Sequence, residues 1–395
     1  MLRISVYRIF LVFLRLGLTS FGGPVAHLGY FHSALVKRLR WLDEDSFAEL
    51  IGLCQFLPGP SSSQVSIGIG LAKAGWRGAI AAWMGFTLPS AVLMTMLGIG
   101  MGYFGAGIPG WLSHGLILVA VPVVAQAILL MTRQLCPDWP RRFLALVSTI
   151  ILLWLPLPAI QPLTIAAGGV LGWFFFKGFG KNLPMAFPTG LNRRTAFAAL
   201  GLFFLLLALL PFVSGLLHNH ALAVFSAFYQ SGALVFGGGH VILPLLQSAV
   251  IPTGWVSGAD FLAGYGAAQA MPGPLFSFAA YLGAVMTSAP NNLAGAALCL
   301  AAIYLPSFLL VIGALPVWQA VRHHPQVRGA LSGVNAVVVG LLLAAFCRPV
   351  WTSAVHAPSD LVLALAGFGL LTAANMPSWA VVILTVLGAG LLAAV

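Results

Sequence analysis

The tripeptide Pro-Gly-Pro occurs twice in this chain, at residues 58–60 and 272–274, and each copy follows a glutamine by three residues (Gln55 and Gln269). Proline lacks a backbone N–H and clashes with the preceding helical turn, so a helix that reaches this tripeptide must stop. Both copies lie in strongly apolar sequence. Broken backbone at membrane depth is tolerated only where protein or a water-filled cavity satisfies its polar groups. Two equivalent breaks therefore predict a solute site that is built from two repeats.

Side chains with hydrogen-bond donors follow the first break directly: Ser61, Ser62, Ser63 and Gln64. They fall at the start of the next predicted helix, where free backbone N–H groups and about half a positive charge favour an anion. Any one serine could instead cap the helix, but three in succession exceed what a cap needs. The second copy has Leu275, Phe276 and Ser277 at these positions, which predicts an asymmetric pocket. Gln55 and Gln269 could face the solute or form hydrogen bonds between helices.

Glycine-rich bends form a second pair of motifs: Gly22-Gly23-Pro24 before His27, and Gly237-Gly238-Gly239 before His240. Glycines let the backbone approach a ligand closely and expose N–H groups to an anion, although tight helix packing is the alternative. His27 and His240 could donate a hydrogen bond to an oxyanion or relay protons, or they could be structural. We therefore include both bends in the predicted anion site.

Two charged residues are expected inside apolar sequence. Arg15 interrupts an apolar run, where an ionised side chain costs at least about 3 kcal/mol unless it is paired or hydrated. It is the best single candidate for attracting an anion, and the alternative is that its head group reaches the nearest membrane face. Glu49 is the one carboxylate expected to be buried, and it could couple protons or pair with Lys73 or Arg77.

The composition is that of an integral membrane protein made of helices. Hydrophobic residues make up 60% of the 395 residues, charged residues make up 6%, and the mean hydropathy is +1.02. Apolar runs are separated by Gly, Pro and Asn and not by alternating polar residues, which argues against an outer-membrane barrel. Lys and Arg outnumber Asp and Glu by 18 to 7. They sit at predicted helix ends, so they indicate membrane orientation and not nucleic-acid binding.

Several kinds of site are absent from the sequence. The four cysteines have no paired spacing, so neither a disulfide framework nor a zinc site is expected. There is no phosphate-binding loop that ends in Gly-Lys-Ser/Thr, no Ser/His/Asp arrangement and no His-Glu-x-x-His zinc helix. We therefore expect neither an enzyme nor a bound cofactor or metal.

The chain is a tandem duplication. Gly17 aligns with Gly232, 215 residues later, and the bends and Pro-Gly-Pro motifs align at nearly the same shift. We assign residues 1–176 to the first repeat, 177–216 to a linker expected in the cytoplasm together with one unrepeated apolar helix (195–216), and 217–395 to the second repeat.

The predicted helices of the first repeat differ in length. After the glycine bend come two short helices around Pro-Gly-Pro and then four long spans: 45–57, 61–73, 76–104, 111–131, 143–158 and 161–176. Each short helix would rise only about 20 Å, against a hydrocarbon core of roughly 30 Å, so the two should form a re-entrant pair.

The unrepeated helix determines the topology. An even number of crossings per repeat plus one connector turns the second repeat upside down. Basic segments of the first repeat have nearly uncharged counterparts in the second, as Lys37–Arg40 and Ile251–Gly254 illustrate. We therefore predict an all-α polytopic membrane protein with an inverted-topology duplicated repeat, re-entrant or broken helices, about 9 to 13 spans and a cytoplasmic N terminus.

Together these motifs resemble those of the chromate ion transporter family in its long-chain, two-domain form. The matching stretches are residues 19–27, 53–64, 85–90, 236–240 and 269–276. The resemblance implies a multi-pass carrier of the bacterial inner membrane that exports chromate and confers chromate resistance, driven by ion gradients and not by ATP.

The predicted partners are a chromate-like or sulfate-like oxyanion and the lipid bilayer, with a homodimer as one oligomeric state. A dianion that crosses hydrocarbon needs donors in place of its hydration shell, which the two helix starts would supply. Two transport alternatives stay open, a sulfate-like oxyanion uptake carrier and an anion channel. The alternative of another class is a membrane sensor or enzyme that binds an anion without translocating it.

Overall fold

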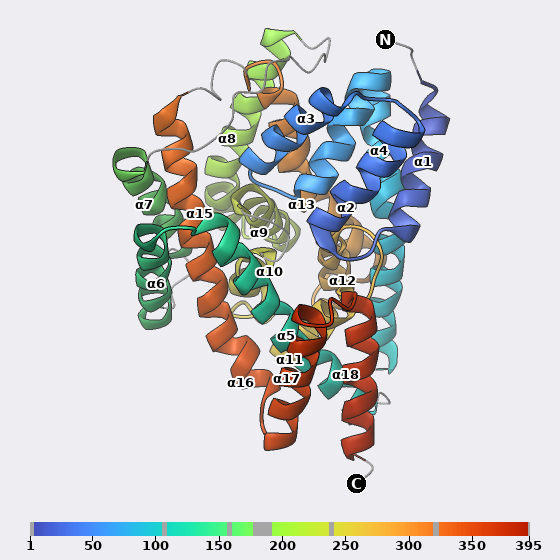
Figure 1. The fold of residues 1–395 in the computed structure, drawn as a ribbon, viewed down its shortest axis with the longest axis vertical. Helices are drawn as coiled ribbons and strands as arrows, with labels where there is room; N and C mark the ends of the chain where they lie inside the picture. The colour runs from blue at the N-terminus through green and yellow to red at the C-terminus, as the bar shows by residue number, and fades with distance from the viewer. Residues whose placement is uncertain are drawn as a thin grey trace.

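The computed structural model describes residues 4–104, 109–155, 160–176, 192–236, 241–318 and 324–393, and these ranges are helical without a β-strand (Figure 1). The helices of the first half are α1 (Val6–Thr19), α2 (Gly23–Phe31), the π-helical η1 (His32–Arg38), α3 (Glu44–Phe56), α4 (Ser61–Phe104), α5 (Gly110–Leu135), α6 (Trp139–Trp154) and α7 (Ile160–Phe175). The connecting helix is α8 (Arg193–Leu217).

The second half repeats this order. Its helices are α9 (His220–Leu234), α10 (Ile242–Val250), α11 (Gly258–Ala268), the 3-10 turn η4 (Leu275–Ser277), α12 (Phe278–Val285), α13 (Asn292–Ala314), α15 (Pro325–Ala345), η5 (Phe346–Trp351), α16 (Thr352–Ala354), α17 (Pro358–Thr372) and α18 (Ser378–Ala393).

Both Pro-Gly-Pro motifs break the chain as predicted. α3 ends at Phe56 and α4 begins at Ser61, while α11 ends at Ala268 and η4 begins at Leu275. α4 is itself two helices, because Ala74 and Gly75 leave the helical conformation and Gly75 has a φ of 64°. The predicted boundary between 73 and 76 is therefore confirmed.

Some predicted boundaries of the first half differ from the structure: α5 ends at Leu135 and not at 131, and α6 ends at Trp154 and not at 158. α6 begins at Trp139 and not at 143, because the Asp138 carboxylate accepts the Arg141 N–H at 3.1 Å and Pro140 suits the first helical turn. The helix after the second Pro-Gly-Pro starts as a 3-10 turn, in which the Ser277 hydroxyl donates to the carbonyl of Pro274 at 2.8 Å.

Helices that are long and apolar enough to cross a membrane alternate with shorter ones. Five clear spans lie in the described part of the chain: Ser61–Met101, Gly110–Leu135, Arg193–Leu217, Asn292–Ala314 and Pro325–Ala354. α1 has 14 residues and α2 has nine, so they rise about 21 and 14 Å. The chain reverses between them at Gly22 and Gly23, whose φ values of 99° and 80° are open to glycine.

The two halves interlock. α5 of the first half packs against α17 and α18 of the second, and α15 of the second half packs against α6 and α7 of the first. α1 packs on α4 as α9 packs on α13. A Cβ on Gly17 would lie 2.6 Å from the Phe86 carbonyl oxygen, and one on the aligned Gly232 would clash with the Ile303 carbonyl. The largest apolar core includes residues of both halves, among them Leu118 and Val338.

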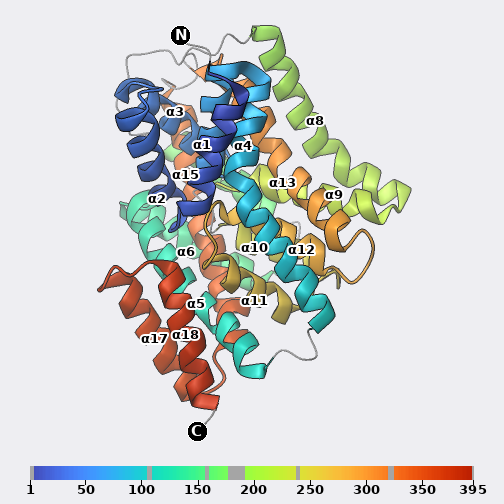
Figure 2. The same cartoon turned by 90° about the vertical axis from the view of Figure 1, so that its right-hand side faces the viewer.

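The termini lie at opposite ends of the molecule in both views (Figures 1 and 2). α3 lies toward the end that carries the N terminus, whereas α11, which occupies the aligned place in the second half, lies in the half nearer the C terminus. The two copies therefore run in opposite directions along the long axis of the molecule.

Candidate functional site

Each Pro-Gly-Pro turn is held by the other half of the chain. The N–H of Gly59 donates to the carbonyl of Val235 at 2.6 Å, and the N–H of Gly273 donates to the carbonyl of Ser20 at 2.8 Å. Ser20 and Val235 are the residues that end α1 and α9. The two turns therefore make equivalent contacts with the opposite half of the chain.

No side chain larger than hydrogen fits at either central glycine. Gly59 and Gly273 have φ values of 122° and 92°, which other residues rarely adopt. A Cβ on Gly59 would lie 2.8 Å from the Ser307 hydroxyl, and one on Gly273 would lie 3.0 Å from the Ser90 hydroxyl. These two serines end a Leu-Pro-Ser motif that occurs in both repeats, at residues 88–90 and 305–307, so each turn packs against the other half's copy of this motif.

A cavity of about 260 Å³ lies beside the second turn and combines both halves. Its lining includes Gly22, Gly23, Pro24, Gln126, Gln269, Gly273, Asn375 and Ser378. One water molecule needs only about 10–15 Å³, so the cavity has room for a tetrahedral oxyanion and some of its hydration waters. Among the described residues, its lining contains no Asp, Glu, Lys or Arg.

Two helix starts border this cavity. α2 begins at Gly23 without a side-chain cap, and α18 begins at Ser378. The tip between α17 and α18 therefore meets the α1–α2 bend, and the rings of Phe21 and Trp379 are 6.2 Å apart there. Free N–H groups and the positive ends of helix dipoles favour an anion in this place.

Side-chain amides add donors. The Gln126 Nε2 donates to the carbonyl of Leu371 at 3.0 Å. The Gln269 Nε2 is buried and has no hydrogen-bond partner among the described residues. It is therefore free to donate to a ligand.

A cluster of buried hydroxyls adjoins the first turn. Ser62 pairs with the Nδ1 of His27 at 3.3 Å, which links α4 to α2. The Tyr304 hydroxyl lies close to the hydroxyls of Ser63 and Thr87, yet none of the three oxygens has a well-aligned partner in the described ranges. Thr87 and Tyr304 precede the two Leu-Pro-Ser motifs, so they occupy aligned positions in the two repeats.

Unpartnered buried polar atoms concentrate at these motifs. In the part of the chain that the structure describes, those at these motifs are Ser20 Oγ, His27 Nε2, Ser63 Oγ, Gln64 Oε1, Thr87 Oγ1, Gln269 Nε2, Tyr304 Oη and Ser307 Oγ, and Trp83 Nε1 and His220 Nε2 are unpartnered as well. A buried polar atom without a partner costs about 1–3 kcal/mol. Native proteins rarely tolerate many such atoms in one region, which indicates that water or a polar ligand belongs there.

The predicted site residues fall into four groups, of which the last lies apart from the site. Gly22, Gly23, Gln269 and Gly273 line the cavity. The hydroxyl cluster or the adjoining first turn contains His27, Gly59, Ser61, Ser62, Ser63 and Gln64, with the Gln64 Nε2 donating to the Pro58 carbonyl at 2.6 Å. Gly238, Gly239 and His240 lie outside the described residues.

The remaining predicted residues lie apart from these atoms. Arg15 is exposed on the outer face of α1, in a groove that it shares with Arg8 and Arg38. Gln55 is exposed at the end of α3. Glu49 is buried on α3 and has a polar partner. Ser277 is buried, and its hydroxyl is already used by the Pro274 carbonyl.

Sequence reasoning missed several polar residues of the site: Thr87, Ser90, Gln126, Tyr304, Ser307, Asn375 and Ser378. The repeated Leu-Pro-Ser motif was a usable signal for the residues of α4 and α13, because it recurs with the duplication. Gln126 is a lone amide in an otherwise apolar stretch. Nothing local indicates that the α17–α18 tip reaches the α1–α2 bend.

A second cavity, of about 1190 Å³, lies at the N-terminal end, where α1, η1, α3 and α4 meet. Its basic lining residues are Arg8, Lys37, Arg40 and Lys73. The acidic ones are Asp43 and Glu44, and the Ser46 backbone N–H together with Lys73 holds the pKa of Asp43 below its ordinary value against the effect of burial. Four basic groups against two acidic groups give this vestibule a positive potential.

Several curated proteins are similar to this chain. A probable chromate transport protein of Synechococcus elongatus is 28% identical over 341 residues, which is 84% of this chain and 81% of that protein. A chromate transport protein of Cupriavidus metallidurans is 27% identical over 380 residues, covering 93% and 88%. One of Pseudomonas aeruginosa is 27% identical over 352 residues, covering 86% and 79%.

No solved structure matches this chain. The family model described as chromate transporter matches residues 7–173 and again residues 222–393. Most of the chain is therefore covered by two copies of one family domain. The chain belongs to the chromate transporter family.

Proposed function

We propose that this protein is a secondary active transporter that exports chromate, a tetrahedral dianion, across the bacterial inner membrane and thereby gives chromate resistance. The proposal rests on the unpartnered buried polar atoms that concentrate at the Pro-Gly-Pro and Leu-Pro-Ser motifs. Each Pro-Gly-Pro turn is bound by the opposite half of the chain. The names of the relatives supply the substrate, since those proteins are chromate transport proteins.

The site suits a dianion that must leave its hydration shell. Hydroxyls, amides and backbone N–H groups donate without bringing a fixed charge, so the empty site stays neutral in hydrocarbon. A buried lysine or arginine would hold the anion too firmly for release and would be expensive when the site is empty. Chromate and sulfate have the same shape and charge, so both should compete for these donors.

The crossing of the two halves suits alternating access. Each Pro-Gly-Pro turn contacts the opposite half of the chain. The two oppositely directed repeats can rock about these contacts, so that the cavity opens first to one face of the membrane and then to the other. We place the N-terminal end in the cytoplasm, because the basic segments gather there. The basic vestibule would then collect cytoplasmic anions, which favours export.

Purified protein in liposomes tests the proposal. Chromate flux should saturate with concentration, and sulfate should inhibit it competitively. Flux that rises linearly without saturation would favour a channel, and flux only toward the cytoplasmic face would favour uptake. If chromate binds but no flux occurs with or without an imposed gradient, the protein is a sensor or an enzyme and the proposal is wrong.

A further inference from the structure

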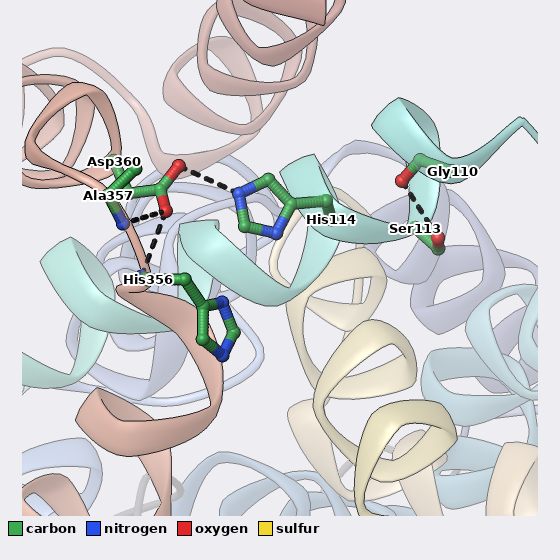
Figure 3. A network of polar contacts seen from close by, with 6 residues as sticks. All are labelled: Gly110, Ser113, His114, His356, Ala357 and Asp360. Carbon is green, nitrogen blue, oxygen red and sulfur yellow. Dashed lines mark hydrogen bonds and ion pairs between the residues drawn. The ribbon is translucent and has the colours of Figure 1, made fainter.

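A histidine–aspartate pair ties the two halves together far from the candidate cavity. The His114 Nε2 donates to Oδ1 of Asp360 at 2.8 Å (Figure 3). Asp360 is nearly buried, whereas about a third of the His114 side chain is exposed. α17 and the first turns of α5 lie in the half of the molecule nearer the C terminus.

Backbone groups hold the Asp360 carboxylate in place independently of His114. Its Oδ2 accepts the backbone N–H groups of His356 and Ala357, at 2.9 and 3.0 Å, so Asp360 already receives two donors from the start of α17. Because three N–H groups stabilise the ionised form, the carboxylate remains a permanent anion.

The geometry determines where a proton would bind. The Nε2–H of His114 donates to Asp360 in either protonation state, so an added proton must go to Nδ1. That nitrogen has no hydrogen-bond partner among the described residues, and the side chain reaches solvent. The ring of His356 lies 6.1 Å from that of His114 and is exposed, so it can pass protons to and from water.

Other titratable groups near α5 are few. Of the elements packed against α5, α16 and α18 carry none in their described residues. The remaining packed elements carry Arg348 and Cys347 on η5, Asp260 and Tyr265 on α11, and Arg328 on α15, in addition to Asp360 on α17. Of these groups, Asp360 is the one that pairs with His114 in the described part of the chain.

The same two helices also line the anion cavity. α5 and α17 are joined a second time by the Gln126–Leu371 hydrogen bond, 12 residues further along α5 and 11 further along α17. The two joints are therefore about 18 Å apart on parallel helices. Both Gln126 and Leu371 line the cavity, so a change at the outer joint alters a wall of the cavity.

We infer that His114 and Asp360 form the proton-binding site that couples transport to a proton gradient. A proton on Nδ1 places a positive charge on the donor of a hydrogen bond whose acceptor is already ionised, which strengthens that bond, and so favours the conformation in which α5 and α17 are joined at both ends. Loss of the proton loosens the outer joint and frees the α17–α18 hairpin. In exchange for an exported anion, His114 takes up one proton from solvent in the joined conformation and releases it in the conformation in which the hairpin is free.

This inference rests on the proposed transport function, and the test separates the two. The variant is H114Q, since glutamine keeps an N–H donor for Asp360 but cannot titrate. The matched control is H218Q, at an exposed histidine that follows α8 and forms a hydrogen bond with the Leu216 carbonyl within its own segment. Liposomes containing each protein are assayed for chromate exchange at equal pH and for uphill chromate movement under a pH gradient, with a pH dye inside.

We expect wild type and H218Q to accumulate chromate under the pH gradient and to move protons with it. Their chromate Kd should change with pH by up to about one decade per pH unit, the limit for one linked proton. H114Q should exchange chromate within about twofold of wild type but lose both the accumulation and the pH dependence.

Three outcomes would overturn the inference. H114Q that still couples chromate to protons, or wild type that exchanges chromate but ignores the pH gradient, would disprove it and leave the proposed function standing. Wild type that exchanges no anion at all would remove both.

Discussion

Replacing Ser63 by alanine should preserve or raise the stability of the anion-free protein and, at the same time, weaken anion binding. The Ser63 hydroxyl is fully buried and, although the Tyr304 hydroxyl lies close to it, has no well-aligned hydrogen-bond partner among the described residues. Removing it ends a desolvation cost of about 1–3 kcal/mol and leaves only a small cavity. The free energy of unfolding should therefore stay constant or rise by up to about 1 kcal/mol.

The effect of this substitution on binding has the opposite sign. A hydrogen bond to a charged group contributes about 1.5–3 kcal/mol, so the Kd for chromate should rise roughly 10- to 150-fold. Ser277, the aligned serine of the second repeat, is the matched control. It is equally buried, but its hydroxyl already donates to Pro274 at 2.8 Å. S277A should therefore destabilise by about 1 kcal/mol and change the Kd less than about twofold.

Thermal unfolding in detergent and chromate binding by calorimetry measure the two quantities on the same samples. The reasoning predicts a crossed pattern, in which S63A loses affinity but not stability and S277A loses stability but not affinity. If S63A lowers the unfolding temperature and leaves the Kd unchanged, the hydroxyl is structural and the site lies elsewhere. Equal effects of the two substitutions on the Kd would also contradict the asymmetry of the pocket.

Three further predictions follow from positions described above. G59A should lower the free energy of unfolding by more than about 2 kcal/mol, because the substitution combines an unfavourable φ with a steric clash. G254A has an unfavourable φ but no neighbour within contact distance, so it should lower this free energy by only about 1 kcal/mol. Equal losses of the two variants in urea unfolding would contradict this reasoning. An impermeant maleimide should label the exposed Cys347 and not Cys136, because burial raises the pKa of Cys136 to about 11 and the thiolate is the reactive form. Mass spectrometry of the labelled peptides measures this, and labelling of Cys136 in preference to Cys347 would contradict the prediction. R15Q should slow chromate entry at low salt by a few-fold and leave the Kd nearly unchanged, since Arg15 is exposed; a large rise in the Kd would instead place Arg15 in the site.

Breaks in the chain were predictable because their causes are local. A proline or a glycine interrupts a helix wherever the helix lies, so the ends of α3, the start of α4 and the interruption at Ala74 and Gly75 could be read from the sequence. Because the sequence is duplicated, the corresponding helix breaks could be assigned in the second half as well. The resemblance of the motifs indicated the family.

Pairing between the halves was not predictable in the same way. Gln126 meets Leu371 and Tyr304 lies beside Thr87, at sequence separations of more than 200 residues. Nothing near Gln126 indicates which face of α5 is turned toward α17, because all faces of that helix are apolar. Arg15 shows the converse problem, since an apolar neighbourhood in sequence does not establish burial when one helix face is exposed.

The reciprocal hydrogen bonds of Gly59 and Gly273 have a consequence for biosynthesis. Each turn needs a carbonyl that the opposite half supplies, so the half that leaves the ribosome first must wait with an unsatisfied N–H until α9 has been made. Insertion into the bilayer should therefore finish late and as a single event. A shorter chain with only one such half would have to borrow the carbonyl from a second molecule, and for it assembly and maturation would be the same step.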